Sequence, residues 1–131
     1  MRLRTLIEAN CMDIEIGWSR DSGVLVAKPV GRVYSAQYIE WQAALMSGIK
    51  PDDGAMVLDC EGVTYLSSAG LRVVLETARR FEGPGRAFAL SRPTKGVRKV
   101  LAASGFDKII SIFDSTDEAI LQTAKEAGAD G

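Results

Sequence analysis

The chain has 131 residues, a mass of 14.1 kDa and a net charge of −1, from 16 basic and 17 acidic side chains. This length suits one domain, and a content of 47% hydrophobic and 25% charged residues is typical of a globular chain. The balanced charge argues against direct binding of nucleic acid. The absence of histidine excludes a Ser-His-Asp triad, a Cys-His dyad and an HExxH zinc site built from this chain alone.

The two cysteines, Cys11 and Cys60, are too few for a disulfide framework or a four-thiolate zinc site, and we expect both to be reduced. The first residues contain no apolar run of signal-peptide length. No stretch approaches the ~18–20 apolar residues that cross a bilayer. We therefore expect a cytoplasmic protein without a membrane span, with a mobile N-terminal extension over residues 1–11 and one domain over residues 12–131.

The regular pattern begins with a β-hairpin. Apolar and polar residues alternate over residues 13–19, which predicts a half-buried strand. The turn sequence Asp-Ser-Gly at 21–23 leads into a second strand over residues 23–30. Because Pro29 has no amide donor, this strand is expected to end there or to lie at the edge of the sheet.

A helix is predicted to follow from about Ser35, a favourable N-cap residue. Tyr38, Trp41 and Leu45 are spaced so as to form one apolar stripe that faces the sheet. The next apolar run, residues 55–60, is short and bounded by turns, so it is predicted to be a strand buried on both faces, with Cys60 as part of its packing.

Helices and strands alternate over the rest of the chain. The whole order, β-β-α-β-α-β-α-β-α, predicts an α/β domain with a mixed, mostly parallel sheet of about five strands covered by about four helices. The elements expected in this second half are a helix over 68–81, a strand over 86–90, a helix from Pro93 to about Ala103, a strand over 108–113 and a last helix that is capped by Asp-Ser-Thr at 114–116 and runs to about Ala127.

One segment, residues 57–76, carries the strongest functional signal. It leads from a buried strand to two adjacent serines, Ser67 and Ser68, which open a helix. One of them can be a simple N-cap, and the residues alone leave this interpretation open. The other would present its hydroxyl at the positive end of the helix, where a phosphoryl group of about −1.5 to −2 charges is tolerated. A bare serine that binds a partner and a phosphoserine that does not would together form a switch.

The chain from about Met12 to Ala127 resembles a STAS domain of the bacterial anti-sigma-factor antagonist type. The resemblance rests on an ordered set of motifs rather than on one string, and the Ser-Ser-Ala-Gly-Leu-Arg sequence is its most specific member. The matching segments are Gly-Arg-Val at 31–33, Val-Leu-Asp at 57–59, Ser-Ser-Ala-Gly-Leu-Arg at 67–72 and Val-Arg-Lys-Val-Leu at 97–101.

The resemblance implies that the protein is not an enzyme and binds an anti-sigma factor that is a serine kinase of the GHKL type. Phosphorylation of Ser68 by that kinase would release the chain, and a PP2C-type phosphatase would reverse it. Ser67, which stands where many members have Asp, is a secondary phosphorylation candidate or a cap. The kinase would bring ATP and Mg²⁺, so this chain needs no cofactor.

We expect the partner to dock around the start of the 68–81 helix, with Tyr34 and an exposed Leu66 as anchors and Ser68 at the centre. The full expected contact set is Tyr34, Ser35, Leu66, Ser67, Ser68, Ala69, Leu71 and Arg72.

Tyr34 is a departure from the family pattern, because many members carry Asp at this position. It favours an alternative interpretation, a STAS scaffold that is not phosphorylated and serves a sensor complex or a membrane transport system. A third hypothesis, an enzyme with Ser68 as nucleophile, is disfavoured because the chain has no histidine and no evident lysine to activate the hydroxyl.

Overall fold

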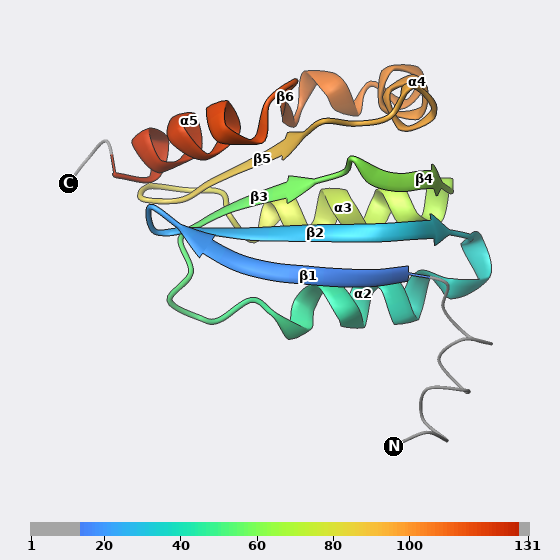
Figure 1. The fold of residues 1–131 in the computed structure, drawn as a ribbon, viewed down its shortest axis with the longest axis horizontal. Coiled ribbons are helices and arrows are strands. Elements are labelled where there is room, and N and C mark those ends of the chain that lie inside the picture. Colours follow the sequence, from blue (N-terminus) through green and yellow to red (C-terminus); the bar gives the residue numbers. More distant parts are fainter. Residues whose placement is uncertain (1–13, 129–131) are drawn as a thin grey trace.

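The computed structural model describes residues 14–128, so Cys11 and the predicted extension over residues 1–11 lie outside the described part (Figure 1). The core is a six-stranded sheet in the order β1-β2-β3-β5-β6, with β4 paired to β2. β1 runs antiparallel to β2 and the other pairs are parallel, as predicted. The strands are β1 (Ile14–Asp21), β2 (Val24–Val33), β3 (Ala55–Asp59), β4 (Gly62–Leu66), β5 (Ala87–Ser91) and β6 (Ser111–Phe113).

Helices cover both faces of this sheet. Met56 and Leu58 of β3 belong to the larger apolar cluster, which also contains buried residues of three helices, α2, α3 and α4. Val57 of β3 belongs to a second cluster with Ala119 and Ile120 of the fourth helix, α5. Because successive strand residues point to opposite faces, β3 is buried on both, as predicted. The helices are α2 (Tyr38–Ser47), α3 (Ser68–Arg79), α4 (Lys95–Ser104) and α5 (Thr116–Gly128).

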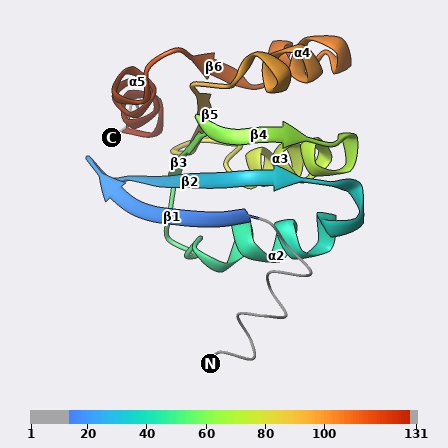
Figure 2. The ribbon, with the colours of Figure 1, turned by 45° about the vertical axis from the view of Figure 1, so that its right-hand side comes forward.

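β4 is a strand that the sequence analysis did not predict. Residues 25–27 of β2 pair with β3, and the C-terminal part of β2, from Val30 to Val33, pairs with β4. Pro29 lies between these two paired stretches, so neither β3 nor β4 pairs with it; on the other side it lies opposite Ile16 of β1, and β2 continues through it. The expectation that the strand ends at Pro29 or lies at an edge was therefore wrong. Figure 2 shows β2 and β4 side by side and pointing in the same direction.

Two other predicted features differ in the structure. Tyr38 was expected to face the sheet, but it is the first residue of α2 and its side chain is exposed, whereas Trp41 and Leu45 are buried as predicted. The strand expected over 108–113 is only three residues long. A 3₁₀ turn, Phe106–Lys108, follows the end of α4, and Ile109 and Ile110 continue it as a turn and a bend before β6 begins at Ser111.

The step from β3 to β4 is held by a buried carboxylate, Asp59. Arg92 donates to both of its oxygens, at 3.0 and 3.4 Å, and the Glu61 amide donates at 3.1 Å. Burial, the largest single influence, raises the pKa of Asp59, but the hydrogen bonds from Arg92, the Glu61 amide and Thr116 together outweigh it and hold the pKa below its usual value. The ionised form of Asp59 is therefore the one that stabilises the fold.

A depressed carboxyl pKa makes a prediction about pH. The contribution of Asp59 to stability is complete above the unfolded-state pKa of about 3.9 and is lost as the pH falls through the lower folded-state value. We expect Asp59→Asn to lower the free energy of unfolding at pH 7 by about 1–3 kcal/mol. When both proteins are acidified from pH 7 to pH 3, the free energy of unfolding should fall less in the variant than in the wild type. Urea denaturation at both pH values measures this.

The matched control is Asp114→Asn, because Asp114 is an exposed carboxylate paired with Arg98 at 2.8 Å. Such a surface pair contributes little to stability, so this variant is expected to unfold like the wild type at both pH values. Identical acid sensitivity of the Asp59→Asn variant and the wild type would contradict the role assigned to Asp59.

Candidate functional site

The candidate site lies where β2 and β4 end and α3 begins, at one end of the sheet (Figure 1). Val33 and Leu66, the last residues of the two strands, are paired neighbours. The Ser67 amide donates to the Val33 carbonyl at 2.9 Å, which ties the start of α3 to the end of β2. The sheet therefore fixes the position of the first turn of α3.

Ser67 and Ser68 have different environments. The Ser67 side chain is buried, and its Oγ accepts a hydrogen bond from the Gly70 amide at 3.0 Å, which makes Ser67 the N-cap of α3. Ser68 is the first residue of the helix and is exposed. Because Ser67 already caps the helix, the Ser68 hydroxyl is not needed for that purpose.

Gly70 and Trp41 hold α2 against the start of α3. The indole N–H of buried Trp41 donates to the Gly70 carbonyl at 3.0 Å. A Cβ at position 70 would lie only 2.8 Å from a methyl of Val33 and 2.9 Å from a methyl of Leu66, so glycine permits this close approach. The Trp41 bond therefore ties α2 to the first turn of α3, and the absence of a side chain at Gly70 lets that turn pack against the ends of β2 and β4.

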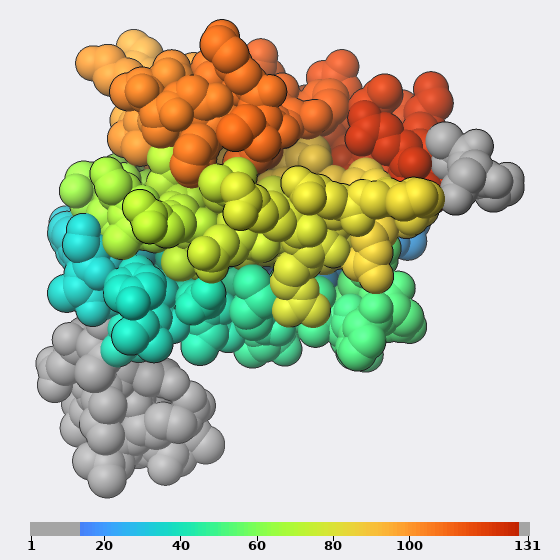
Figure 3. Space-filling view, turned by 180° about the vertical axis from the view of Figure 1, so that it is seen from behind, coloured from blue at the N-terminus to red at the C-terminus, as the bar shows by residue number. Residues whose placement is uncertain are grey.

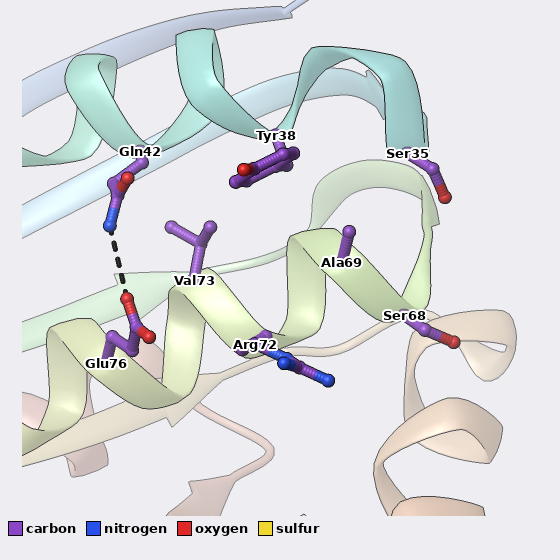
Figure 4. Close-up of a pocket in the computed structure, with 8 residues that line it drawn as sticks. All are labelled: Ser35, Tyr38, Gln42, Ser68, Ala69, Arg72, Val73 and Glu76. Carbon is purple, nitrogen blue, oxygen red and sulfur yellow. Dashed lines mark hydrogen bonds between the residues drawn. The ribbon is translucent and has the colours of Figure 1, made fainter.

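A groove of about 590 Å³ lies in that space. Tyr38 of α2 faces Ala69 and Val73 of α3 across it (Figure 4). Further along, Gln42 donates to the Glu76 carboxylate at 3.1 Å, which bridges the two helices.

A second groove, of about 490 Å³, lies on the other side of α3, against α4 and the 3₁₀ turn that follows it. Figure 3 shows this face of the molecule, with α3 in yellow-green between α2 in teal and α4 in orange. Ser68 and Arg72 line both grooves. They therefore form a ridge between two hollows.

Three exposed tyrosines lie around this end of the sheet: Tyr34, Tyr38 and Tyr65 are 40%, 45% and 47% exposed. The rings of Tyr34 and Tyr65 are 5.4 Å apart between centroids, and the Arg32 guanidinium lies 6.0 Å from the Tyr34 ring centroid. Pairs of exposed aromatic rings are typical anchors of protein interfaces. We call Tyr34, Tyr38 and Tyr65 the tyrosine rim.

The structure keeps part of the expected contact set at the surface and buries the rest. Tyr34, Ser35, Ser68 and Arg72 are exposed and Ala69 is half-buried. The prediction of an exposed Leu66 was wrong: the buried members of the set are Leu66, Ser67 and Leu71, which are 3%, 4% and 2% exposed. Leu66 belongs to the core because it pairs with Val33, and Leu71 faces the core from α3.

Sequence reasoning missed Tyr65, Tyr38, Gln42 and Glu76 as residues of this surface. Tyr65 is exposed because the register of β2 and β4 shifts by one residue, so that Thr64 and Tyr65 both face solvent. No sequence signal marks such a bulge. The exposure of Tyr38 was foreseeable from its place at the start of the helix, where a tyrosine readily keeps its hydroxyl in water.

Other chemistry is limited in the described part of the chain. Within residues 14–128, no group of three His, Cys, Asp or Glu side chains lies in a position to hold a metal ion. No helix over the same residues is both long and apolar enough to span a membrane. Burial raises the pKa of the Cys60 thiol far above its ordinary value, with a smaller contribution from Asp59 in the same direction, so this thiol stays protonated.

The chain is similar in sequence to known proteins. Residues 18–119 match the family model of the STAS domain. A protein of Bordetella bronchiseptica named as an anti-sigma factor antagonist, BtrV, is 34% identical over 97 residues, which cover 74% of this chain and 84% of that protein. These matches confirm the expected resemblance: the chain belongs to the STAS domain family.

Several solved structures have a fold similar to that of this chain. An anti-sigma factor antagonist from Mycobacterium paratuberculosis matches with a TM-score of 0.75 at 21% identity, covering 84% of this chain and 93% of that one. The phosphorylated form of the Bacillus cell fate determinant SpoIIAA matches with a TM-score of 0.61 at 19% identity, covering 82% of this chain and 98% of that one. At these identities the likeness concerns the fold.

Proposed function

We propose that this chain is an anti-sigma factor antagonist, a non-enzymatic module that binds an anti-sigma factor of the GHKL serine kinase type and is released by phosphorylation of Ser68. The observation that carries the proposal is the placement of Ser68, exposed on a ridge between two grooves while Ser67 supplies the helix cap. The relative named as an anti-sigma factor antagonist supports the choice of partner.

The partner would supply the chemistry of the switch. Its bound ATP and Mg²⁺ would present the γ-phosphoryl group to Ser68 Oγ; an O–P bond forms at the serine, the bond from the γ-phosphorus to the bridging oxygen breaks, and ADP leaves. The hydroxyl proton passes to a base of the kinase. A PP2C-type phosphatase then hydrolyses the phosphoserine and restores the binding form. Because the proposed cycle requires ATP, we expect it to take place in the cytoplasm.

The added phosphate acts on docking rather than on folding. Ser68 is exposed and the first helical turn accepts negative charge, so the phosphoprotein keeps its fold. A partner that covers the ridge would have to desolvate about −1.5 to −2 charges, which opposes binding. The same surface thus binds the partner when Ser68 carries a free hydroxyl and releases it when Ser68 is phosphorylated.

Phosphate incorporation tests this function. The chain is incubated with ATP, Mg²⁺ and a GHKL-type serine kinase of the same organism, and mass spectrometry locates the product. We expect one phosphate at Ser68 and none in Ser68→Ala, which retains Ser67. Phosphate on Ser67, or on neither serine, would contradict the proposed switch; the second result would favour the unphosphorylated scaffold.

The tyrosine rim is proposed to anchor the partner. We expect Tyr34→Ala and Tyr65→Ala each to weaken binding of the kinase by about tenfold, because tyrosine is enriched among the residues that contribute most to binding at protein interfaces. Isothermal titration calorimetry measures the change. Leu121→Ala is the control, since Leu121 is an even more exposed apolar residue on α5, away from the site. If both tyrosine variants bind the kinase with the affinity of the wild type, the tyrosine rim does not anchor the partner.

A further inference from the structure

Arg72 lies one helical turn beyond Ser68 on the same face of α3, at the i+4 position. Residues at this spacing are about 5–6 Å apart between their Cβ atoms. Long helical side chains lean toward the N-terminal end of their helix, which here is the Ser68 end. Figure 4 shows the Arg72 guanidinium lying on the Ser68 side of its own backbone position. The guanidinium is therefore within reach of a group added to the Ser68 oxygen.

Arg72 has no competing partner among the described residues. It is exposed and makes no hydrogen bond or ion pair within residues 14–128. Glu76, the acidic residue at i+4 from Arg72, is turned the other way and accepts from Gln42 of α2 (Figure 4). The obvious intrahelical salt bridge is thus absent, and the guanidinium remains available.

Few of the residues that line the two grooves beside Ser68 are charged. Arg72 and Glu76 are the charged residues that line the groove against α2, and Arg72 is the charged residue that lines the groove against α4. Among the described residues that line the two grooves, Arg72 is therefore the cation next to a phosphate on Ser68. Arginine suits this role because its planar group can donate two hydrogen bonds to one phosphate.

We propose that Arg72 binds the phosphoryl group on Ser68 within the same chain. This inference rests on the proposed function, since it takes Ser68 as the modified residue. Phosphorylation then changes the docking ridge in two ways: it adds negative charge at Ser68, and it withdraws the Arg72 guanidinium from contact with a partner. Arg72 is a positioning residue for the phosphate and has no part in the transfer reaction.

The test is a ³¹P NMR titration of the isolated protein with phosphoserine placed at position 68 during synthesis. Phosphoserine has a second pKa near 6, and a nearby cation favours the dianion. We expect Arg72→Gln to raise this pKa by about 0.2–0.7 relative to the unsubstituted phosphoprotein, in proportion to the strength of an exposed ion pair. Arg72→Lys, which keeps the charge but not the planar fork, is expected to recover part of the difference.

Arg79→Gln is the matched control, because Arg79 is an exposed arginine of the same helix and lies about 16 Å from Ser68 along the helix axis. At physiological salt this distance exceeds the screening length of about 8 Å, so the phosphate should titrate as in the unsubstituted phosphoprotein. Equal phosphate pKa values in the Arg72→Gln and unsubstituted phosphoproteins would overturn the inference. The titration contains no kinase, so its result is independent of whether the partner switch itself fails.

Discussion

Phosphoserine at position 68 is expected to weaken binding of the anti-sigma factor kinase by about tenfold to a hundredfold, or about 1.4–2.7 kcal/mol. The reason is the cost of covering a charged group on the ridge between the two grooves. Ser68→Ala is expected to bind at least as tightly as the wild type and to remain bound in the presence of ATP. Ser68→Asp, with a single charge, should fall between the alanine variant and the phosphoprotein. Calorimetry on the four proteins measures the series.

The control for added charge is Ser22→Asp. Ser22 is exposed in the turn between β1 and β2, at the opposite end of β2 from Val33, and its positive φ of 57° is a conformation that aspartate tolerates. This variant should bind like the wild type. If Ser68→Ala, Ser68→Asp and the phosphoprotein all bind with one affinity, charge at position 68 does not control docking and the switch is wrong.

The second large effect concerns stability. Trp41→Ala is expected to lower the free energy of unfolding by about 3–5 kcal/mol, because it leaves a cavity in place of a fully buried indole and removes the hydrogen bond to the Gly70 carbonyl. Trp41→Phe, which keeps most of the ring, should cost about 1–2 kcal/mol. Urea denaturation gives both values from the transition midpoint and slope.

Trp18 provides the matched comparison, since it is half-buried on β1. Trp18→Phe should cost less than Trp41→Phe, and it should leave the α2–α3 groove and partner binding unchanged. Trp41→Phe is expected to weaken partner binding as well, because Trp41 sets how α2 meets the first turn of α3. A loss below about 1 kcal/mol in Trp41→Ala would contradict this account.

The arrangement of elements followed from local patterns. The turn at 21–23 has φ of 57° at Ser22 and 80° at Gly23, as a tight hairpin requires, and Gly105 ends α4 in the left-handed conformation. Residues 55–59 are all buried, as their apolar run between turns predicted. These features depend on neighbours in the sequence, so they can be read from it.

Features that depend on pairing between distant segments could not be predicted in this way. Leu66 is buried because it pairs with Val33, and Tyr65 is exposed because the register shifts between β2 and β4. A single sequence does not specify that register. The distinct roles of Ser67 and Ser68 likewise needed the observed bond from the Gly70 amide to Ser67 Oγ.

The most direct test of the central claim is an NMR footprint of the partner on the chain. The isotope-labelled, unphosphorylated protein is titrated with the unlabelled kinase, and amide shifts are followed by residue. The account predicts that the largest changes fall on the first turns of α3 and on the tyrosine rim, with Ser68 among them, and that α5 and the β1–β2 turn stay unchanged. A footprint centred on α5, with Ser68 unaffected, would contradict it.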